Sequence, residues 1–127
     1  MKPAIEAFHP VELGPKPWGS ELLIAKTEHY IGKVLTMNAG HRGGLQYHVH
    51  KDETFYLLSG TARVTFDAGN GLVYRQMRAG DSYHIPPGAV HQVEAVTDCI
   101  FFEASTPHFD DRVNVGNDYG SATGQSQ

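Results

Sequence analysis

The stretch LQYHVHKDETFYLLSG, residues 45–60, decides how this chain folds and where its chemistry lies. A β-strand points alternate side chains to one face, so we expect Gln46, His48 and His50 to face the same way. Glu53 follows at the head of a second apolar run, which ends at Gly60. An amide, two imidazoles and a carboxylate gathered in this way are the kinds of donor that a divalent metal ion accepts.

The bulk composition is that of one ordinary globular domain. The chain has 127 residues, of which 40% are hydrophobic and 19% charged, and its net charge is −4 with acids and bases interspersed. Because there is no basic stripe, we expect no nucleic-acid partner. No apolar run approaches the roughly 20 residues of a membrane span, and the first residues do not resemble a signal peptide. We therefore expect no membrane partner and a cytoplasmic location.

The pattern of short apolar runs predicts an all-β fold. Turn signals such as NAGHRGG, DAGNG and PPG separate runs that are rich in β-branched and aromatic residues. No amphipathic helical segment exceeds about two turns, which favours a sandwich, jelly roll or barrel. We predict strands at Glu21–Lys26, His29–Met37, Leu45–His50, Thr54–Leu58, Thr61–Asp67, Leu72–Arg78, Ser82–Ile85, His91–Val96 and Cys99–Ala104.

The two ends of the chain differ from this β-rich body. Residues 1–17 are rich in proline, and we expect them to form an N-terminal arm that wraps a sheet edge. We expect residues 18–115 to form the β domain. Residues 116–127 are small and polar and are predicted to be a flexible C-terminal tail.

A second stretch, GDSYHIPPGAVHQV (residues 80–93), brings a further histidine. The Pro-Pro-Gly sequence enforces a reversal, so His91 begins the next strand with little conformational freedom. Glu53 begins what we expect to be the antiparallel neighbour of the strand that carries Gln46 and His48. His91 would then reach this group from a distant strand.

These two stretches resemble the two motifs of the cupin superfamily, which consists of small jelly-roll β-barrels. The first motif has a glycine, a ligand, a histidine, a glutamate and a second glycine at fixed spacing, and it is matched by Gly40, Gln46, His48, Glu53 and Gly60. The second motif is matched by Gly80, Pro86, Gly88 and His91, with Ala95 where an asparagine is usual. The resemblance implies a single cupin β-barrel, or double-stranded β-helix, over residues 18–115.

The register of the first motif is open to a rival interpretation that pairs His48 with His50. That pair leaves only two residues before Glu53 and has no glycine at the required distance upstream. The Gln46–Tyr47–His48 register satisfies both spacings. It is similar to the phosphomannose isomerase-like branch, in which glutamine is a ligand, and the segments KPWG, ETFYLLSG, HIPPG and STP also resemble that branch.

The resemblance implies one divalent transition metal, Zn, Mn, Fe or Ni, held by Gln46, His48, Glu53 and His91. The residue types support it, because imidazoles, a carboxylate and an amide oxygen suit such an ion. The alternative is a barrel whose site has lost its metal. His50 could replace Gln46, add a ligand or carry protons at the edge of the site, and we favour the edge.

The metal set and the resemblance together predict an isomerase or epimerase that acts on a sugar or another small hydroxy-carbonyl compound. His50 and Lys33 are the candidate proton carriers; Lys33 is in phase with apolar neighbours on its strand. Asn114 stands where the branch has a phosphate-binding arginine, and Arg112 lies two positions earlier, which favours an unphosphorylated substrate. A metal-dependent dioxygenase and a non-catalytic small-molecule binder are the alternatives. The superfamily also implies a homodimer.

Overall fold

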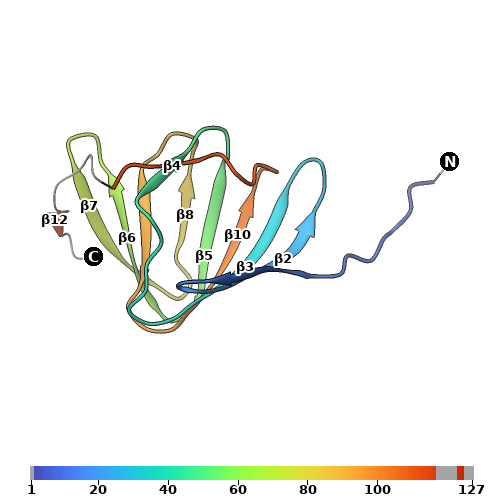
Figure 1. The fold of residues 1–127 in the computed structure, drawn as a ribbon, viewed down its shortest axis with the longest axis horizontal. Helices are drawn as coiled ribbons and strands as arrows, with labels where there is room; N and C mark the ends of the chain where they lie inside the picture. The colour runs from blue at the N-terminus through green and yellow to red at the C-terminus, as the bar shows by residue number, and fades with distance from the viewer. Residues whose placement is uncertain (1, 117–122, 125–127) are drawn as a thin grey trace.

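The structure, a computed structural model, describes residues 2–116 and 123–124. This described part contains strands and no helix, and so no helix in it could cross a membrane. Figure 1 shows the strands arranged in two sheets that face each other. The strands are β1 (Val11–Lys16), β2 (Gly19–Lys26), β3 (Ile31–Met37), β4 (Gln46–His48), β5 (Glu53–Ser59), β6 (Thr61–Asp67), β7 (Leu72–Arg78), β8 (Ser82–Ile85), β9 (His91–Ala95), β10 (Cys99–Ser105), β11 (Arg112–Asn114) and β12 (Thr123–Gly124).

Each sheet has six strands, and strands from distant parts of the chain alternate within it. The first sheet has the order β1-β2-β3-β10-β5-β8, and the second has the order β11-β4-β9-β6-β7-β12. The pairings are antiparallel except for the short contact between β12 and β7. The predicted all-β barrel of the jelly-roll type is confirmed.

The core lies between the two sheets and is built by alternation along each strand. On β5 the side chains of Glu53, Phe55 and Leu57 are buried, whereas those between them are exposed. Phe55 meets Phe101 of β10 edge to face, with ring centroids 5.9 Å apart. Burying each such side chain contributes roughly 1.5–3 kcal/mol, so the register of β5 is strongly fixed. The same alternation turns Glu53 into the interior.

The predicted strands largely coincide with those observed, but β4 is shorter than the predicted strand Leu45–His50. β4 ends at His48, and the chain then bends. The backbone N–H of Val49 donates to the carbonyl of Asp111, and the N–H groups of His50 and Lys51 donate to the Asp111 carboxylate. Our expectation that His50 shares a strand face with Gln46 and His48 was therefore wrong, because these bonds replace the sheet ladder.

The two ends of the chain also contribute to the sheets. Within the predicted N-terminal arm, Val11–Lys16 pairs with β2 as an edge strand, and Figure 1 shows the residues before it extending away from the barrel. Most of the predicted C-terminal tail lies outside the described residues. Within that tail, Thr123–Gly124 pairs in parallel with Val73 and Tyr74 of β7.

Gly60, the last glycine of the first motif, makes the tight turn between β5 and β6. It has a φ of +96°, and a Cβ added there would lie 2.2 Å from the carbonyl oxygen of Asp98 and 2.9 Å from the sulfur of Cys99. Both the backbone conformation and the close approach require glycine.

We therefore expect Gly60→Ala to destabilise the protein by roughly 2–4 kcal/mol, since strain in φ adds to overpacking. Gly80→Ala is the matched control, because Gly80 has a φ of +98° and no heavy atom within 4 Å of its added Cβ. Urea unfolding measures both variants. Equal losses in the two would contradict the close approach as the cause.

Candidate metal centre

The four residues predicted to hold a metal come from both sheets. Gln46 and His48 lie on β4, and Gln46 is the direct cross-strand partner of His91, the first residue of β9. Glu53 begins β5, which belongs to the opposite sheet. The expectation that Glu53 faces β4 across a shared ladder was therefore wrong, because the chain changes sheet between the two strands. Glu53 meets the histidines across the barrel interior instead.

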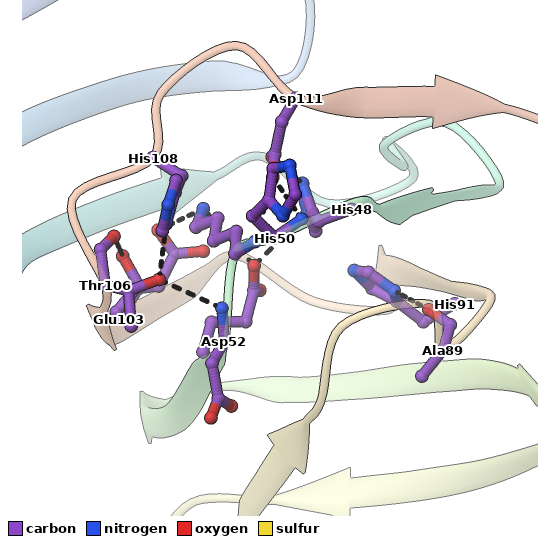
Figure 2. Close-up of polar contacts among 12 residues, drawn as sticks. His48, His50, Asp52, Ala89, His91, Glu103, Thr106, His108 and Asp111 are labelled. Carbon is purple, nitrogen blue, oxygen red and sulfur yellow. Dashed lines mark hydrogen bonds and ion pairs between the residues drawn. The ribbon is translucent and has the colours of Figure 1, made fainter.

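His48, Glu53 and His91 form a compact buried cluster. One ligating atom from each lies within 4.8 Å of the others. Their exposed fractions are 7%, 5% and 5%. Figure 2 shows the side chains of His48 and His91 on neighbouring segments, and their ring centroids are 5.5 Å apart. Three donors of two residue types, held this close at a buried position, could together hold one cation.

The backbone prepares His91 for ligation. Its Nδ1 lies 2.9 Å from the carbonyl oxygen of Ala89, so Nδ1 carries the proton and donates it (Figure 2). The lone pair of Nε2 is then free, which is the usual arrangement of a ligating histidine. Burial lowers the pKa of His91, although the Ala89 bond and the charge of Glu53 act in the other direction. The imidazole is therefore neutral near pH 7, as ligation requires.

Glu53 supplies the negative charge of the cluster. Its Oε2 lies 3.2 Å from Nε2 of His48 and 3.2 Å from Nζ of Lys51. Burial raises the pKa of Glu53, but the close contact with the His48 imidazole and the charge of Lys51 outweigh it and lower that pKa to about 2. Oε2 is buried and has no partner with hydrogen-bond geometry in the described structure. An ionised, under-coordinated oxygen is what a cation would satisfy, so the residues fit a metal.

A cavity of about 500 Å³ opens beside this cluster. Trp18, Leu35, Phe101 and Phe109 supply apolar walls, and Gln46 faces the cavity with the three cluster residues.

The two predicted proton carriers, Lys33 and His50, differ in their position relative to the cavity. Lys33 is buried in the cavity wall. His50 is exposed, is not among the residues that line the cavity, and has its ring centroid 5.7 Å from that of His108.

Alternating buried charges extend from the cluster along the inner face of the first sheet. Lys51 Nζ lies 3.4 Å from Oε2 of Glu103, which is in turn 4.0 Å from Nζ of Lys33. Lys33 also donates to Oε1 of Glu21 at 2.6 Å. Burial raises the pKa of Glu103, the charge of Glu53 adds to this, and Lys51 and Lys33 oppose it, leaving that pKa at about 7. The cavity wall thus carries near-balanced charge.

Sequence reasoning missed three polar residues near the cluster, namely Glu21, Lys51 and Asp111. Lys51 and Asp111 lie in irregular segments, where periodicity carries no signal. Glu21 is buried and in phase with the buried Leu23 on β2, but apolar residues occupy both faces of that strand, so alternation in the sequence gives no clear direction. Glu103 had a usable signal, because it is in phase with the buried Phe101 on β10 and therefore points inward.

Comparison with known proteins identifies the family. The family model described as the cupin domain matches residues 33–102. This chain therefore belongs to the cupin family, as the two motifs and the double-sheet barrel predict.

The relatives also support the resemblance to the phosphomannose isomerase-like branch. Mannose-1-phosphate guanylyltransferase ManC of Salmonella typhimurium is 37% identical over 79 residues, which are 62% of this chain and 16% of that protein. The chain thus corresponds to about one sixth of the length of this relative.

Solved structures share the fold at low sequence identity. The capsular polysaccharide assembling protein CapF of Staphylococcus aureus superposes with a TM-score of 0.75 at 21% identity, covering 87% of this chain and 32% of CapF. Oxalate decarboxylase of Bacillus subtilis, described for its Mn(II) centres, superposes with a TM-score of 0.67 at 20% identity, covering 82% of this chain and 29% of that chain. At this level of sequence identity, the two superpositions show a shared fold and nothing about the reaction.

The raised pKa of Glu103 predicts a pH dependence of stability in the metal-free protein. Because the pKa of Glu103 in the folded protein is about 7, above the usual 4.5 of a glutamate, its contribution to stability is complete below pH 4.5 and is lost as the pH rises through 7. We expect the unfolding free energy of the wild type, relative to that of Glu103→Gln, to fall by roughly 2–3 kcal/mol between pH 5 and 8.

Urea unfolding at several pH values measures this difference. Glu28→Gln is the control, because the Glu28 side chain is 84% exposed and should give a flat difference. A flat difference for Glu103→Gln as well would show that Glu103 is ionised at neutral pH in the folded protein.

Proposed function

We propose that this chain is a divalent-metal-dependent enzyme that isomerises or epimerises a sugar or a related hydroxy-carbonyl compound. The observation that supports the proposal most directly is the convergence of His48, Glu53 and His91 within 4.8 Å at one wall of a cavity. Buried acids and bases continue from that cluster along the same cavity, where a bound substrate would meet them. The homodimer and the cytoplasmic location stay predictions.

The metal would be held by Nε2 of His48, a carboxylate oxygen of Glu53, Nε2 of His91 and the amide oxygen of Gln46. Zn, Mn, Fe and Ni all accept this mixture of nitrogen and oxygen donors. When bound, such an ion supplies Lewis-acid polarisation of a carbonyl and an adjacent hydroxyl. One carboxylate among these donors leaves the site positive, which favours an electron-rich substrate oxygen.

The chain itself would move the proton between neighbouring carbons. Lys33 is the candidate to hold that proton at Nζ, because it is buried in the cavity wall and Glu21 accepts a hydrogen bond from it at 2.6 Å. The apolar side chains of Trp18, Leu35 and Phe109 exclude water from the reacting carbons. His50 is not needed in this scheme, since it lies outside the cavity lining.

The substrate class follows from the size and lining of the cavity. A volume of about 500 Å³ is within the range of small-molecule sites and is ample for a monosaccharide. ManC is named for a reaction of mannose 1-phosphate, which supports a sugar without implying guanylyl transfer here. Arg112 lines the cavity and pairs in register with His48, so a guanidinium is available for an anionic group although Asn114 occupies the expected position.

A metal-dependent dioxygenase is the second candidate. Two histidines and one carboxylate on facing strands are the donor set that non-haem Fe(II) oxygenases use. The two reactions differ in one measurable quantity, because oxygenation consumes O₂ and isomerisation does not.

We expect protein purified without a metal-affinity tag to contain roughly one divalent metal per chain by elemental analysis. His48→Ala and His91→Ala should each lose this metal, and acidification should release it from the wild type, because imidazole must be neutral to ligate. Metal content unchanged in both variants would contradict the proposed ligand set.

The reaction is tested by incubating the metal-loaded protein with unphosphorylated aldoses and ketoses in D₂O and following deuterium exchange at the carbon next to the carbonyl by NMR. We expect exchange without O₂ uptake, and a loss of at least roughly 100-fold in Lys33→Met, the scale of one general acid–base group. Lys26→Met is the matched control, since Nζ of Lys26 and of Lys33 each lie 5.5 Å from the ring of Phe109 but Lys26 is exposed. O₂ uptake with an enol or diol would favour the dioxygenase.

A further inference from the structure

The segment of residues 106–115, here called the C-terminal strap, runs between β10 and β4 and closes one side of the cavity. Its side chains Phe109, Asp110 and Arg112 line the cavity. Backbone hydrogen bonds attach it at both ends: Thr106 N–H donates to the carbonyl of Asp52 at 3.0 Å, and Val115 N–H donates to that of Leu45 at 2.9 Å. The strap is therefore part of the wall that a substrate would contact.

Asp111, in the middle of the strap, joins it to the turn that follows β4. Its Oδ2 accepts hydrogen bonds from the backbone N–H groups of His50 at 2.6 Å and Lys51 at 2.8 Å. Its Oδ1 lies 3.3 Å from Nδ1 of His48, and the Asp111 side chain is only 16% exposed. In Figure 2, Asp111 lies above His48 and His50. One carboxylate thus contacts the turn and a predicted metal ligand.

The contact between Asp111 and His48 lacks hydrogen-bond geometry, and its position suits a His48 ring that ligates through its opposite nitrogen. Both Nδ1 of His48 and Oδ1 of Asp111 are buried and have no partner with hydrogen-bond geometry, although they are 3.3 Å apart. The opposite ring nitrogen, Nε2, faces Glu53 at 3.2 Å. An imidazole ligates through Nε2 only when Nδ1 carries the proton, and that N–H needs a buried acceptor. Asp111 Oδ1 is placed as that acceptor.

We propose that Asp111 is a positioning residue that fixes the tautomer and direction of the His48 ring, and that it thereby couples metal binding to the docking of the C-terminal strap. This inference rests on the proposed metal function. A metal on Nε2 would favour the Nδ1–H tautomer, and that N–H would then donate a hydrogen bond to Oδ1 of Asp111. The carboxylate that is held in this way also holds the turn at His50 and Lys51.

The coupling has a consequence for the cavity. Phe109 of the strap lies next to Lys33, whose Nζ is 5.5 Å from its ring centroid. If the strap loosens, the cavity loses this apolar cover beside Lys33. Metal loading would therefore favour the closed wall before a substrate arrives.

Asp111→Asn isolates the contact with the ring from the contact with the turn. The asparagine oxygen can still accept the backbone N–H groups, whereas its NH₂ faces Nδ1 of His48 and favours the tautomer that cannot ligate through Nε2. We expect Zn²⁺ affinity, measured by competition with a chromophoric chelator, to fall roughly 10- to 100-fold. We expect the thermal unfolding temperature of the metal-free variant to stay close to that of the wild type.

Asp98→Asn is the matched control, because Asp98 also accepts a backbone N–H, that of Ala39 at 2.8 Å, but contacts no predicted ligand. Its Zn²⁺ affinity should equal that of the wild type. If the wild type binds Zn²⁺ and Asp111→Asn binds it as tightly as Asp98→Asn, the positioning role is overturned while the metal site stands. If the wild type binds Zn²⁺ no more tightly than His91→Ala, the metal site itself fails.

Hydrogen exchange of the wild type with and without Zn²⁺ tests the coupling without any variant. We expect Zn²⁺ to slow exchange in peptides that cover residues 49–51 and the C-terminal strap by at least several-fold, and to leave the β6–β7 hairpin unchanged. Protection confined to the segments that carry His48, Glu53 and His91, with no change in the strap, would overturn the coupling.

Discussion

The burial of one carboxylate inside the barrel constrains most of what surrounds it. Glu53 is only 5% exposed, and an unpaired ion in that setting would cost many kcal/mol. Lys51 and His48 approach its Oε2, and Lys51 in turn needs Glu103. The charge compensation thus continues from β5 through β10 to Lys33 on β3 and Glu21 on β2. The inner face of the first sheet is therefore polar near the cluster, because the buried Glu53 needs charged neighbours.

The interior of the barrel is divided into an apolar part and a polar part. One end of the interior is filled by apolar side chains such as Leu57, Val64 and Met77, which are fully buried and hold the two sheets together. The other end is left hollow and lined with charges. The apolar packing fixes the register that turns Glu53, His48 and His91 inward. Contacts such as those of His91 with Ala89 and of His48 with Asp111 then orient the rings.

The sequence anticipated that His48, Glu53 and His91 converge, but it did not anticipate the contacts around them. Motif spacing brought out Gln46, His48, Glu53 and His91, because fixed spacing reflects the register of strands. Alternation failed at His50, since Asp111, about 60 residues later, captures the backbone N–H groups that would have continued β4. It also could not assign Glu53 to the opposite sheet, because the change of sheet depends on a short bend and on pairing with β10. Long-range hydrogen bonds of this kind leave no local pattern.

The most direct test of this account is anomalous X-ray diffraction at the metal absorption edge, from crystals of the protein loaded with Zn²⁺ or Mn²⁺. The account predicts one strong peak per chain, bonded to His48, Glu53 and His91 inside the barrel. A barrel with no peak between these residues, or with peaks confined to exposed histidines such as His50 and His108, would contradict it.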